Sequence, residues 1–345
     1  MLLHFDVIII GSGPAGCAAA ISCNMQGLRA LLITGKKKKD DSNNDEDQPS
    51  ESIHPGVSAI LNQLKAGHCI EAASKGMYEG IAVNDAYNAF GKDEQGDWQG
   101  HHINRTIFDT TLLQAVIEQE IPVHDHDIVS DLIISGDRVT GLITKAGVRF
   151  TCTYMIDASG HKHIAGKKLK FKEKFYSPPL ITWTGLSKNI PADHFIFEKK
   201  CTIFIPHQLG WTWLAPELHN RCTWTRLELK GQQQYLPPLQ LQDFPVAEIK
   251  RSNRRWRAFR PVCKEGVLLC GDAAGIIDPA AGQGILNALL SAAMAAKTIK
   301  ACVDNPALEA VYLARYDDWF ISQYEEKVKM LKGFYAQHGI EIFKK

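Results

Sequence analysis

The chain has 345 residues, enough for about two domains, and its 45% hydrophobic and 22% charged residues are typical of a globular protein. Its 39 Lys and Arg residues offset 38 Asp and Glu residues, so a formal net charge of +1 gives no overall attraction to nucleic acid or acidic lipid. The nine cysteines form no CxxC pair, and no apolar run reaches the roughly 18 residues of a membrane span. We therefore expect a cytoplasmic protein with no disulfide scaffold, metal site, nucleic-acid partner or membrane partner.

The N-terminal residues predict a βαβ unit. Phe5–Ile10 is an apolar, β-branched run typical of a central parallel strand. Gly11-Ser12-Gly13-Pro14-Ala15-Gly16 follows it, and a small-residue helix from Cys17 to Gln26 leads to a second apolar strand at Arg29–Thr34. A glycine-rich turn between a strand and a helix, in a unit of about 30 residues, is the setting of a dinucleotide-binding motif.

Each glycine of this motif has its own task. Gly11 permits the tight turn, Gly13 lets the backbone approach a pyrophosphate, and Gly16 allows close packing of the helix on the strand. The phosphates would lie at the helix N-terminus, where free N–H groups favour negative charge. An acidic residue usually ends the second strand and binds the ribose, but Thr34-Gly35-Lys36 stands there in this chain. We therefore predict weaker binding of the dinucleotide than is usual.

The middle of the chain changes character several times. Residues 36–50 are charged and of low complexity, which predicts a solvated, disordered loop. A helix is expected from Asn104 to Glu118, and residues 121–157 predict short antiparallel strands that end in Asp157-Ala158-Ser159-Gly160. Residues 175–230 alternate aromatic or β-branched with polar residues, which indicates a half-exposed antiparallel sheet.

A second motif follows the buried strand predicted at Val267–Cys270. Gly271-Asp272 comes directly after this strand, so the Asp272 carboxylate would lie at the ligand-binding edge of an α/β sheet. Gly282-Gln283-Gly284-Ile285 then opens an alanine-rich helix that runs to Cys302, and its N-terminus can stabilise negative charge. From Asn305 onward an amphipathic helix carries regularly spaced aromatic residues.

The two motifs together resemble the FAD fingerprints of the hydroxybenzoate-hydroxylase-like flavoproteins, a superfamily of aromatic monooxygenases, flavin-dependent halogenases and isoprenoid reductases. Asp157-Ala158-Ser159-Gly160 resembles the middle motif of that superfamily, and Arg105 matches its arginine beside the flavin phosphates. The resemblance implies FAD as cofactor, bound by Gly11, Gly13, Pro14, Ala15, Gly16, Arg105, Gly160, Gly271, Asp272, Pro279, Gly282, Gln283, Gly284 and Ile285.

The same resemblance implies an α/β fold, in which a Rossmann-like FAD-binding domain of the glutathione-reductase and hydroxybenzoate-hydroxylase type is interleaved with an antiparallel-sheet domain. We assign residues 1–65, 100–165 and 255–305 to the discontinuous FAD-binding domain. The substrate or partner domain would comprise residues 66–99 and 166–254. Residues 306–345 would form a C-terminal helical segment.

Two shorter segments resemble the halogenase-like branch. Glu51-Ser52-Ile53-His54-Pro55 is similar to its Glu-Ser-Leu-Pro-Pro segment, and Gly210-Trp211-Thr212-Trp213-Leu214-Ala215-Pro216 is similar to the Trp-x-Trp-x-Ile-Pro motif of tryptophan halogenases, with Ala215 in place of isoleucine. Halogenases also use a lysine between the flavin and the substrate. Lys75 lies in the corresponding region, but its surroundings match poorly, so we interpret it as a surface lysine.

The length and the aromatic C-terminus resemble most closely the companion flavoproteins of amino-acid oxidases that carry cysteine tryptophylquinone, the LodB/GoxB-like proteins. This resemblance implies an FAD-dependent monooxygenase that uses molecular oxygen to hydroxylate a tryptophan side chain in the precursor of such a quinone-bearing oxidase. Its electrons would come from transient NAD(P)H or from another external reductant. Two alternatives remain open: a flavin-dependent halogenase or oxygenase of a small aromatic compound, and a non-catalytic maturation partner.

Candidate catalytic residues are His54, Pro279 and Trp211. His54 follows a predicted active-site segment and could donate a proton, Pro279 would stiffen the flavin loop, and Trp211 would line the substrate site together with Trp213 and Trp224. Asp278 either caps the flavin loop or acts as a base. A basic run with Arg251, Arg254, Arg255, Arg257 and Arg260 predicts a surface that docks an acidic partner protein.

Overall fold

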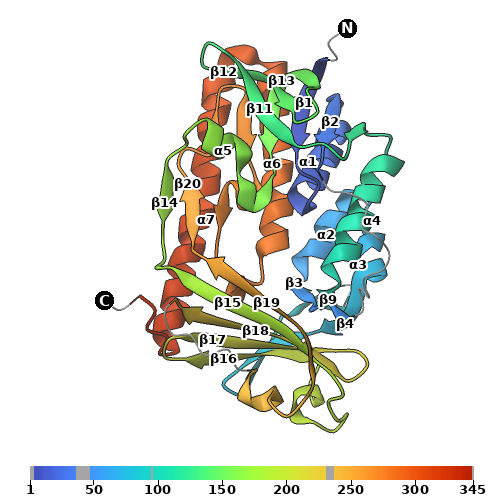
Figure 1. Cartoon of the computed structure of the whole chain (residues 1–345), viewed down its shortest axis with the longest axis vertical. Coiled ribbons are helices and arrows are strands. Elements are labelled where there is room, and N and C mark those ends of the chain that lie inside the picture. Colours follow the sequence, from blue (N-terminus) through green and yellow to red (C-terminus); the bar gives the residue numbers. More distant parts are fainter. Residues whose placement is uncertain (1–3, 36–46, 95, 231–236, 344–345) are drawn as a thin grey trace.

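The computed structural model describes residues 4–35, 47–94, 96–230 and 237–343 of the chain. A mixed sheet with a parallel centre lies toward the N-terminus, and a sheet that is antiparallel except for one strand pair lies at the other end of the molecule (Figure 1). This arrangement is the α/β fold expected for a flavoprotein of this type, with a long C-terminal helix beside both sheets.

The first sheet is built around β1 and β13. Its strand order is β10-β2-β1-β13-β12-β11, and β22 pairs with β13 and β21. β13 runs parallel to β1 and β22 but antiparallel to β12, so one long strand joins both kinds of pairing. The strands are β1 His4–Ile10, β2 Ala30–Ile33, β10 Val123–His124, β11 Val129–Ser135, β12 Arg138–Thr144, β13 Arg149–Asp157, β21 Cys263–Lys264 and β22 Val267–Leu269.

Helices bury the apolar strands of this sheet. α1 Pro14–Met25 packs against α6 Gly284–Asp304, and α6 in turn contacts α2 Gly56–Gln63 and α7 Glu309–Gln337. α4 Arg105–Glu118 packs against α1 and against α3 His68–Ala73, and the short α5 Ile164–Lys168 contacts β11, β13 and β22. By length and composition α6 could cross a membrane, but more than half of its apolar window is buried, as in the core helix of a globular fold.

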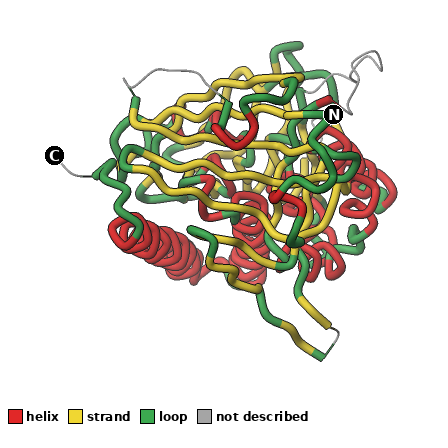
Figure 2. Tube along the Cα trace, turned by 90° about the horizontal axis from the view of Figure 1, so that it is seen from below, coloured by secondary structure: helices red, strands yellow, loops and turns green. Residues whose placement is uncertain are grey.

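The second sheet has the order β19-β15-β18-β17-β16-β5-β6. Figure 2, viewed from below, shows its strands lying across this end of the molecule. They are β5 Gly80–Val83, β6 Ala86–Ala89, β15 Leu180–Ser187, β16 Cys201–His207, β17 Gly210–Glu217, β18 Arg221–Leu229 and β19 Val246–Arg254. One face of the sheet covers a separate small core that includes Leu214 and Trp224, and its other face is directed toward the first sheet.

Three small sheets complete the fold. One has the order β3-β9-β4, a second has the order β14-β20-β23, and β7 pairs with β8. Their strands are β3 Glu51–Ile53, β4 Ser74–Tyr78, β7 Lys92–Asp93, β8 Gly96–Asp97, β9 Gly100–Ile103, β14 Glu173–Phe175, β20 Arg257–Phe259 and β23 Gly275–Ile276.

Three tyrosine hydroxyls of α7 form hydrogen bonds to other elements of the molecule. The Tyr316 and Tyr324 hydroxyls donate to the main-chain oxygens of Leu269 and Ile276, each at 2.7 Å. Farther along the helix the Tyr335 hydroxyl accepts a hydrogen bond from the Trp211 indole N–H, also at 2.7 Å. α7 therefore connects the strand β22, the segment after it and the second sheet.

The structure refines several expectations. The parallel pairing of β10 and β13 differs from the purely antiparallel strands expected over 121–157, because β10 pairs with β2, and β13 pairs with β1 along one edge and with β12 along the other. Residues 36–46 of the expected loop lie outside the described residues, whereas residues 47–50 are held in place: the Asp47 carboxylate pairs with Lys188 at 2.5 Å. The domain division stays a proposal, and β4, within residues 66–99, pairs with β9 rather than with the second sheet.

Candidate active site

Three separate sequence motifs lie at one edge of the parallel sheet. Ile10 is in register with both Ile33 and Asp157, and Asp157 is in register with Leu269, so β1, β2, β13 and β22 end at the same level. The glycine motif, the segment 157–160 and Gly271-Asp272 each follow one of these strand ends. This is the carboxyl edge, where ligands of α/β sheets bind.

Close backbone contacts explain three of the glycines. A Cβ on Gly16 would lie 1.6 Å from the oxygen of Gly11, and a Cβ on Gly11 would lie 2.6 Å from the oxygen of Ala158. Gly271 has a positive φ of 55°, and its Cβ would approach Cβ of Ala15 to 2.8 Å. The first motif therefore packs directly against the second and the third.

Other glycines leave room for a ligand. A Cβ on Gly13, Gly282 or Gly284 would meet no atom within 4 Å. Gly13 and Gln283 are the N-caps of α1 and α6, and neither helix has a side-chain cap, so the first-turn N–H groups remain available. Open glycines at two uncapped helix N-termini fit the pyrophosphate and the electron-rich ring edge of FAD.

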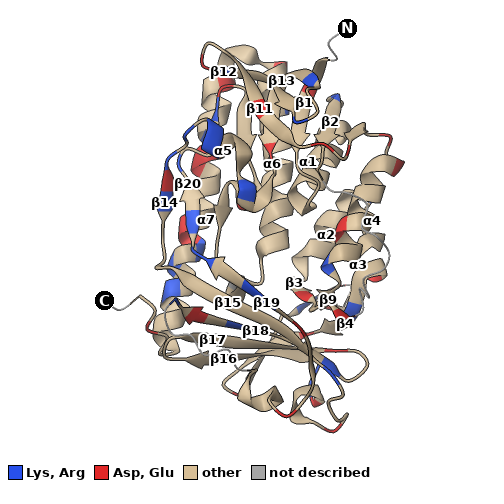
Figure 3. Ribbon diagram, in the orientation of Figure 1, with Lys and Arg blue, Asp and Glu red and all other residues tan. Residues whose placement is uncertain are grey.

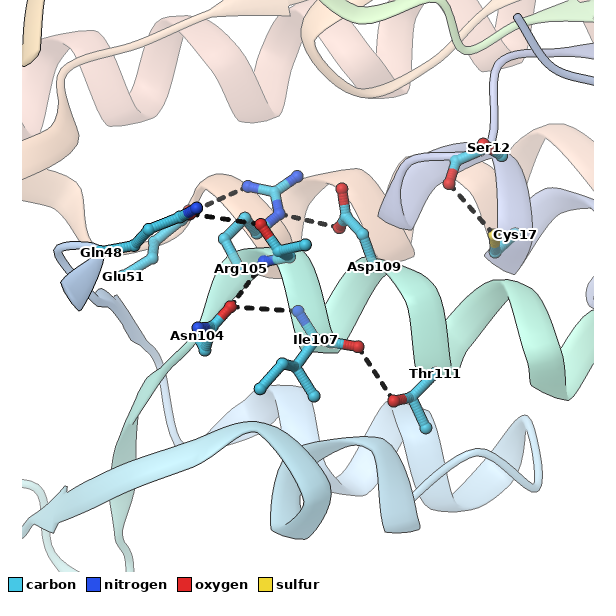
Figure 4. A network of polar contacts seen from close by, with 10 residues as sticks. Ser12, Cys17, Gln48, Glu51, Asn104, Arg105, Ile107, Asp109 and Thr111 are labelled. Carbon is cyan, nitrogen blue, oxygen red and sulfur yellow. Dashed lines mark hydrogen bonds and ion pairs between the residues drawn. The ribbon is translucent and has the colours of Figure 1, made fainter. Parts of the chain in front are cut away.

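Arg105 lies at the cavity wall, and its role beside the flavin phosphates stays a prediction. Asn104 caps α4, because its Oδ1 accepts the main-chain N–H groups of Thr106 and Ile107 at 2.9 and 3.1 Å. The Arg105 guanidinium then pairs with Glu51 at 2.6 Å and with Asp109 at 2.8 Å (Figure 4). This double pairing holds a cation at the cavity wall, where it can meet the phosphates of FAD.

Asp272 is exposed to the cavity that it lines. Partial desolvation by the surrounding protein raises the pKa of its carboxyl group, an effect that the positive charge of Arg254 partly offsets. Hydrogen bonds from the hydroxyls of a bound ribityl chain would stabilise its ionised form.

Two hydroxyl groups, and not a carboxylate, lie at the end of β2. The hydroxyls of Ser12 and Thr34 are 2.7 Å apart and both side chains are buried. Thr34 therefore fastens the end of the strand to the glycine motif and offers no carboxylate to the ribose. Lys36 lies outside the described residues. Weak retention of FAD stays a prediction.

A cavity of about 670 Å³ extends from these motifs to the second sheet and α7. The predicted FAD ligands Arg105, Gly271, Asp272, Pro279, Gly282 and Gly284 form one side. The strands contribute Thr182, Thr184, Trp211, Trp213, Thr223, Thr225, Lys250, Arg251, Ser252 and Arg254. The helices contribute Asn287, Leu290, Ser291, Trp319, Phe320, Gln323, Tyr324 and Lys327. The predicted ligands Gly11, Gly13, Pro14, Ala15, Gly16, Gly160, Gln283 and Ile285 lie outside this lining.

Strand register explains which tryptophans face the cavity. Trp213 is opposite Thr225 and Trp211 is opposite Leu227, so all four side chains share one face of the sheet. Trp224 is opposite Leu214 and is fully buried in the small core on the other face. The interpretation of Trp224 as a cavity residue is therefore wrong.

Asp278 stiffens the loop that carries Pro279. Its carboxylate accepts the Ala280 main-chain N–H at 2.8 Å and the Trp256 indole N–H at 2.9 Å. The Tyr335 hydroxyl also bonds to it, and Tyr335 in turn accepts from Trp211. Burial raises the pKa of Asp278, and these hydrogen bonds counteract the rise. The geometry is that of a loop cap shared with α7.

Two halogenase-like segments meet in space. The Trp213 indole N–H donates to the Ser52 hydroxyl at 3.2 Å, and Ser52 is 3.0 Å from Nδ1 of the buried His102. Burial lowers the pKa of His102 to about 3, so the ring is neutral. The Glu51-Ser52 segment and the Trp-x-Trp motif therefore form adjoining parts of the cavity wall.

Two other sequence candidates lie elsewhere. His54 does not line the cavity; its Nδ1 accepts the Gly56 main-chain N–H at 3.0 Å at the start of α2. Lys75 does not line it either, and its ammonium group donates to the Gln48 main-chain oxygen at 2.7 Å. A proton-donating role for His54 stays a prediction.

The sequence did not point to the threonines of β15 and β18 or to Lys327. Thr182-x-Thr184 and Thr223-x-Thr225 each place two hydroxyls on one strand face, a signal that period-two alternation could have supplied. Lys327 gave no such signal, because only the packing of α7 on α6 brings it to the cavity.

The fold and the site together define an FAD-dependent oxidoreductase. Residues 92–339 match the tryptophan halogenase family, and residues 6–42 match an FAD binding domain. The chain therefore belongs to the tryptophan halogenase family.

Similar proteins agree with this assignment. The 1H-pyrrole-2-carbonyl-[peptidyl-carrier protein] brominase of Pseudoalteromonas luteoviolacea (strain 2ta16) is 25% identical, over 91% of this chain and 82% of the brominase. The structure of the flavin-dependent brominase Bmp2 has a TM-score of 0.81 and 21% identity, over 96% of this chain and 87% of Bmp2. The peptidyl tryptophan dihydroxylase QhpG has a TM-score of 0.73 and 16% identity, over 98% of this chain and 77% of QhpG.

Proposed function

We propose that this protein is a flavin-dependent halogenase or oxygenase of a small aromatic compound. The observation that carries the proposal is a cavity in which several predicted FAD ligands, Asp272 among them, face Trp211, Trp213 and the aromatic side of α7. The 25% identity to a pyrrole-modifying brominase supports an aromatic substrate. The relatives thus favour this reading over the tryptophylquinone pathway expected from the sequence.

Some residues of the chain would bind FAD, and others would enclose the substrate. Reduced FAD, when bound, supplies the activation of molecular oxygen. The glycine motif, Arg105 and Asp272 would hold FAD. Asp278 and Pro279 would keep the flavin loop rigid, and the indoles of Trp211 and Trp213 would orient the ring of the substrate and exclude water from it.

The direct test supplies FAD, a flavin reductase with NADH, oxygen and either bromide or chloride to the purified protein. Indole, phenol and pyrrole derivatives are incubated with it, and products are identified by mass spectrometry. Halogenated or hydroxylated rings that require the protein support the proposal. Consumption of reductant without any modified ring, across the whole panel, contradicts it.

A second candidate is the hydroxylation of a tryptophan in a partner protein, and one observation favours it. β19 is largely exposed and carries Lys250, Arg251 and Arg254 beside the cavity, so an acidic segment of a cytoplasmic partner could dock there (Figure 3). The fold likeness to QhpG agrees with this candidate. Its test is the mass of a co-expressed oxidase precursor, which would rise by multiples of 16 Da as oxygen atoms are added. An Asp272→Ala variant that still matures the precursor would instead indicate a non-catalytic partner.

A further inference from the structure

One wall of the cavity is formed by α6 and α7, next to the segment 275–284 that carries predicted FAD ligands. Trp319, Phe320 and Tyr324 of α7 and Leu290 of α6 supply apolar and aromatic surface there. Tyr324 is fixed by its hydrogen bond to Ile276, and its ring is stacked with that of Phe320 at 6.4 Å. This wall therefore has ordered aromatic surfaces of the kind that bind a flat ring.

One cation projects from the same helix. Lys327 is half-buried, and its ammonium group donates a hydrogen bond to the neutral side chain of Asn287 in the first turns of α6. Among the described residues, no carboxylate lies within ion-pair distance of it. Burial lowers the pKa of Lys327, and the negative charge of the neighbouring Glu326 offsets only part of this effect.

The other cations of the cavity lie on α4 and on β19. Arg105 pairs with Glu51 and Asp109, and Lys250 pairs with Glu248 at 3.3 Å. The Arg251 guanidinium lies over the Trp183 ring at 5.5 Å, and among the described residues the buried Nε of Arg254 has no hydrogen-bond partner. Lys327 is thus the cation that α7 contributes to the cavity, beside its aromatic side chains.

The electrostatics of this wall favour an anion. The Lys327 ammonium group stabilises negative charge, and a carboxylate could replace its lost hydration. We infer that the substrate is an aromatic carboxylic acid, whose ring lies against Trp319, Phe320 and Tyr324 and whose carboxylate pairs with Lys327. The inference rests on the proposed function, because it names the substrate class of that same cavity.

Binding measurements test this without turnover. Indole-3-acetate, phenylacetate and pyrrole-2-carboxylate are titrated into the FAD-loaded protein by calorimetry, each beside its own amide. A charge-assisted contact at a half-buried site predicts that at least one acid binds about tenfold more tightly than its amide. Equal affinity for acid and amide in all three pairs would overturn the inference.

Two lysines of the same helix provide a matched pair of variants. Lys327→Met should remove the preference for the acid and leave the affinity for the amide unchanged, which also shows that the variant is folded. Lys329→Met, at an exposed position two residues away, should behave like the wild type. A preference that survives Lys327→Met, or that bromide alone abolishes by competition, would contradict a carboxylate at Lys327.

These results are separate from those of the turnover assay. If the protein prefers the acid through Lys327 but modifies no ring, the result supports this binding site and contradicts the proposed function. If the protein modifies rings but shows no preference for acids, the result supports the proposed function and contradicts this inference.

Discussion

The two sides of the cavity are built in different ways. On the FAD side, short consecutive segments carry the site: residues 11–16, 157–160 and 271–284 each follow a strand, and strand register brings them together. On the substrate side, single residues come from β15, β17, β18, β19, α6 and α7. The comparison shows that a shared cofactor is bound by local backbone geometry, whereas the substrate site depends on long-range packing, which varies more freely within a fold.

The largest expected effects come from two glycines of the first motif, one that is needed for packing and one that faces the ligand. Gly16→Ala places a Cβ 1.6 Å from the oxygen of Gly11, so we expect a loss of about 3 kcal/mol or more in the free energy of unfolding. Gly13→Ala meets no atom within 4 Å and should lose less than about 1 kcal/mol, yet its methyl group stands where a phosphate approaches.

Urea unfolding and retention of FAD on desalting measure the two effects. Gly13→Ala should unfold like the wild type and bind FAD at least about tenfold more weakly. If both variants unfold alike, or if Gly13→Ala retains FAD fully, the distinction between packing and ligand-facing glycines is wrong.

The next effect lies on the substrate side. Tyr335→Phe removes the acceptor of the buried Trp211 indole N–H, so we expect a loss of about 1–3 kcal/mol in the free energy of unfolding. Tyr312→Phe on the same helix is the control, since its hydroxyl makes no hydrogen bond that the described residues show. Equal stability of the two variants would mean that α7 is not fastened through Trp211.

A smaller, pH-dependent effect is expected at Asp278. Because burial raises the pKa of this carboxyl in the folded protein, the unfolded chain loses its proton first as the pH rises above about 3.8. The wild type should therefore lose stability relative to Asp278→Asn from that pH upward. Denaturant unfolding of both proteins between pH 4 and pH 7 isolates this group, because other titrations cancel in the difference. A constant difference would contradict the raised pKa.

The smallest effect is expected at Lys75, because its ammonium group is bound to the Gln48 oxygen and does not line the cavity. Lys75→Met should keep turnover of any substrate within about twofold of the wild type. A loss of activity with FAD still bound would place Lys75 at the reaction after all, and would mean that the substrate side closes differently around a bound ring.

The features that could be predicted from the sequence are those that depend on local structure, as on the FAD side of the cavity. The strand at Phe5–Ile10 and the helices expected over Cys17–Gln26 and Asn104–Glu118 depend on neighbouring residues, and the structure confirms them as β1, α1 and α4. The parallel pairing of β13 and the approach of α7 to the cavity depend on segments far apart in the chain, which no local pattern encodes. Trp224 shows an intermediate case, since counting alternate residues from Thr223 would have placed it on the face opposite Trp213.

The most direct test of the whole account is the mass of an aromatic acid after incubation with the FAD-loaded protein, a flavin reductase, NADH, oxygen and bromide. We expect replacement of one ring hydrogen by bromine, or addition of one oxygen atom, in the wild type and not in an Asp272→Ala variant that has lost FAD. If neither the acid nor any of the indole, phenol and pyrrole derivatives is modified while the wild type holds FAD and consumes oxygen, the central claim that this cavity modifies aromatic rings is contradicted.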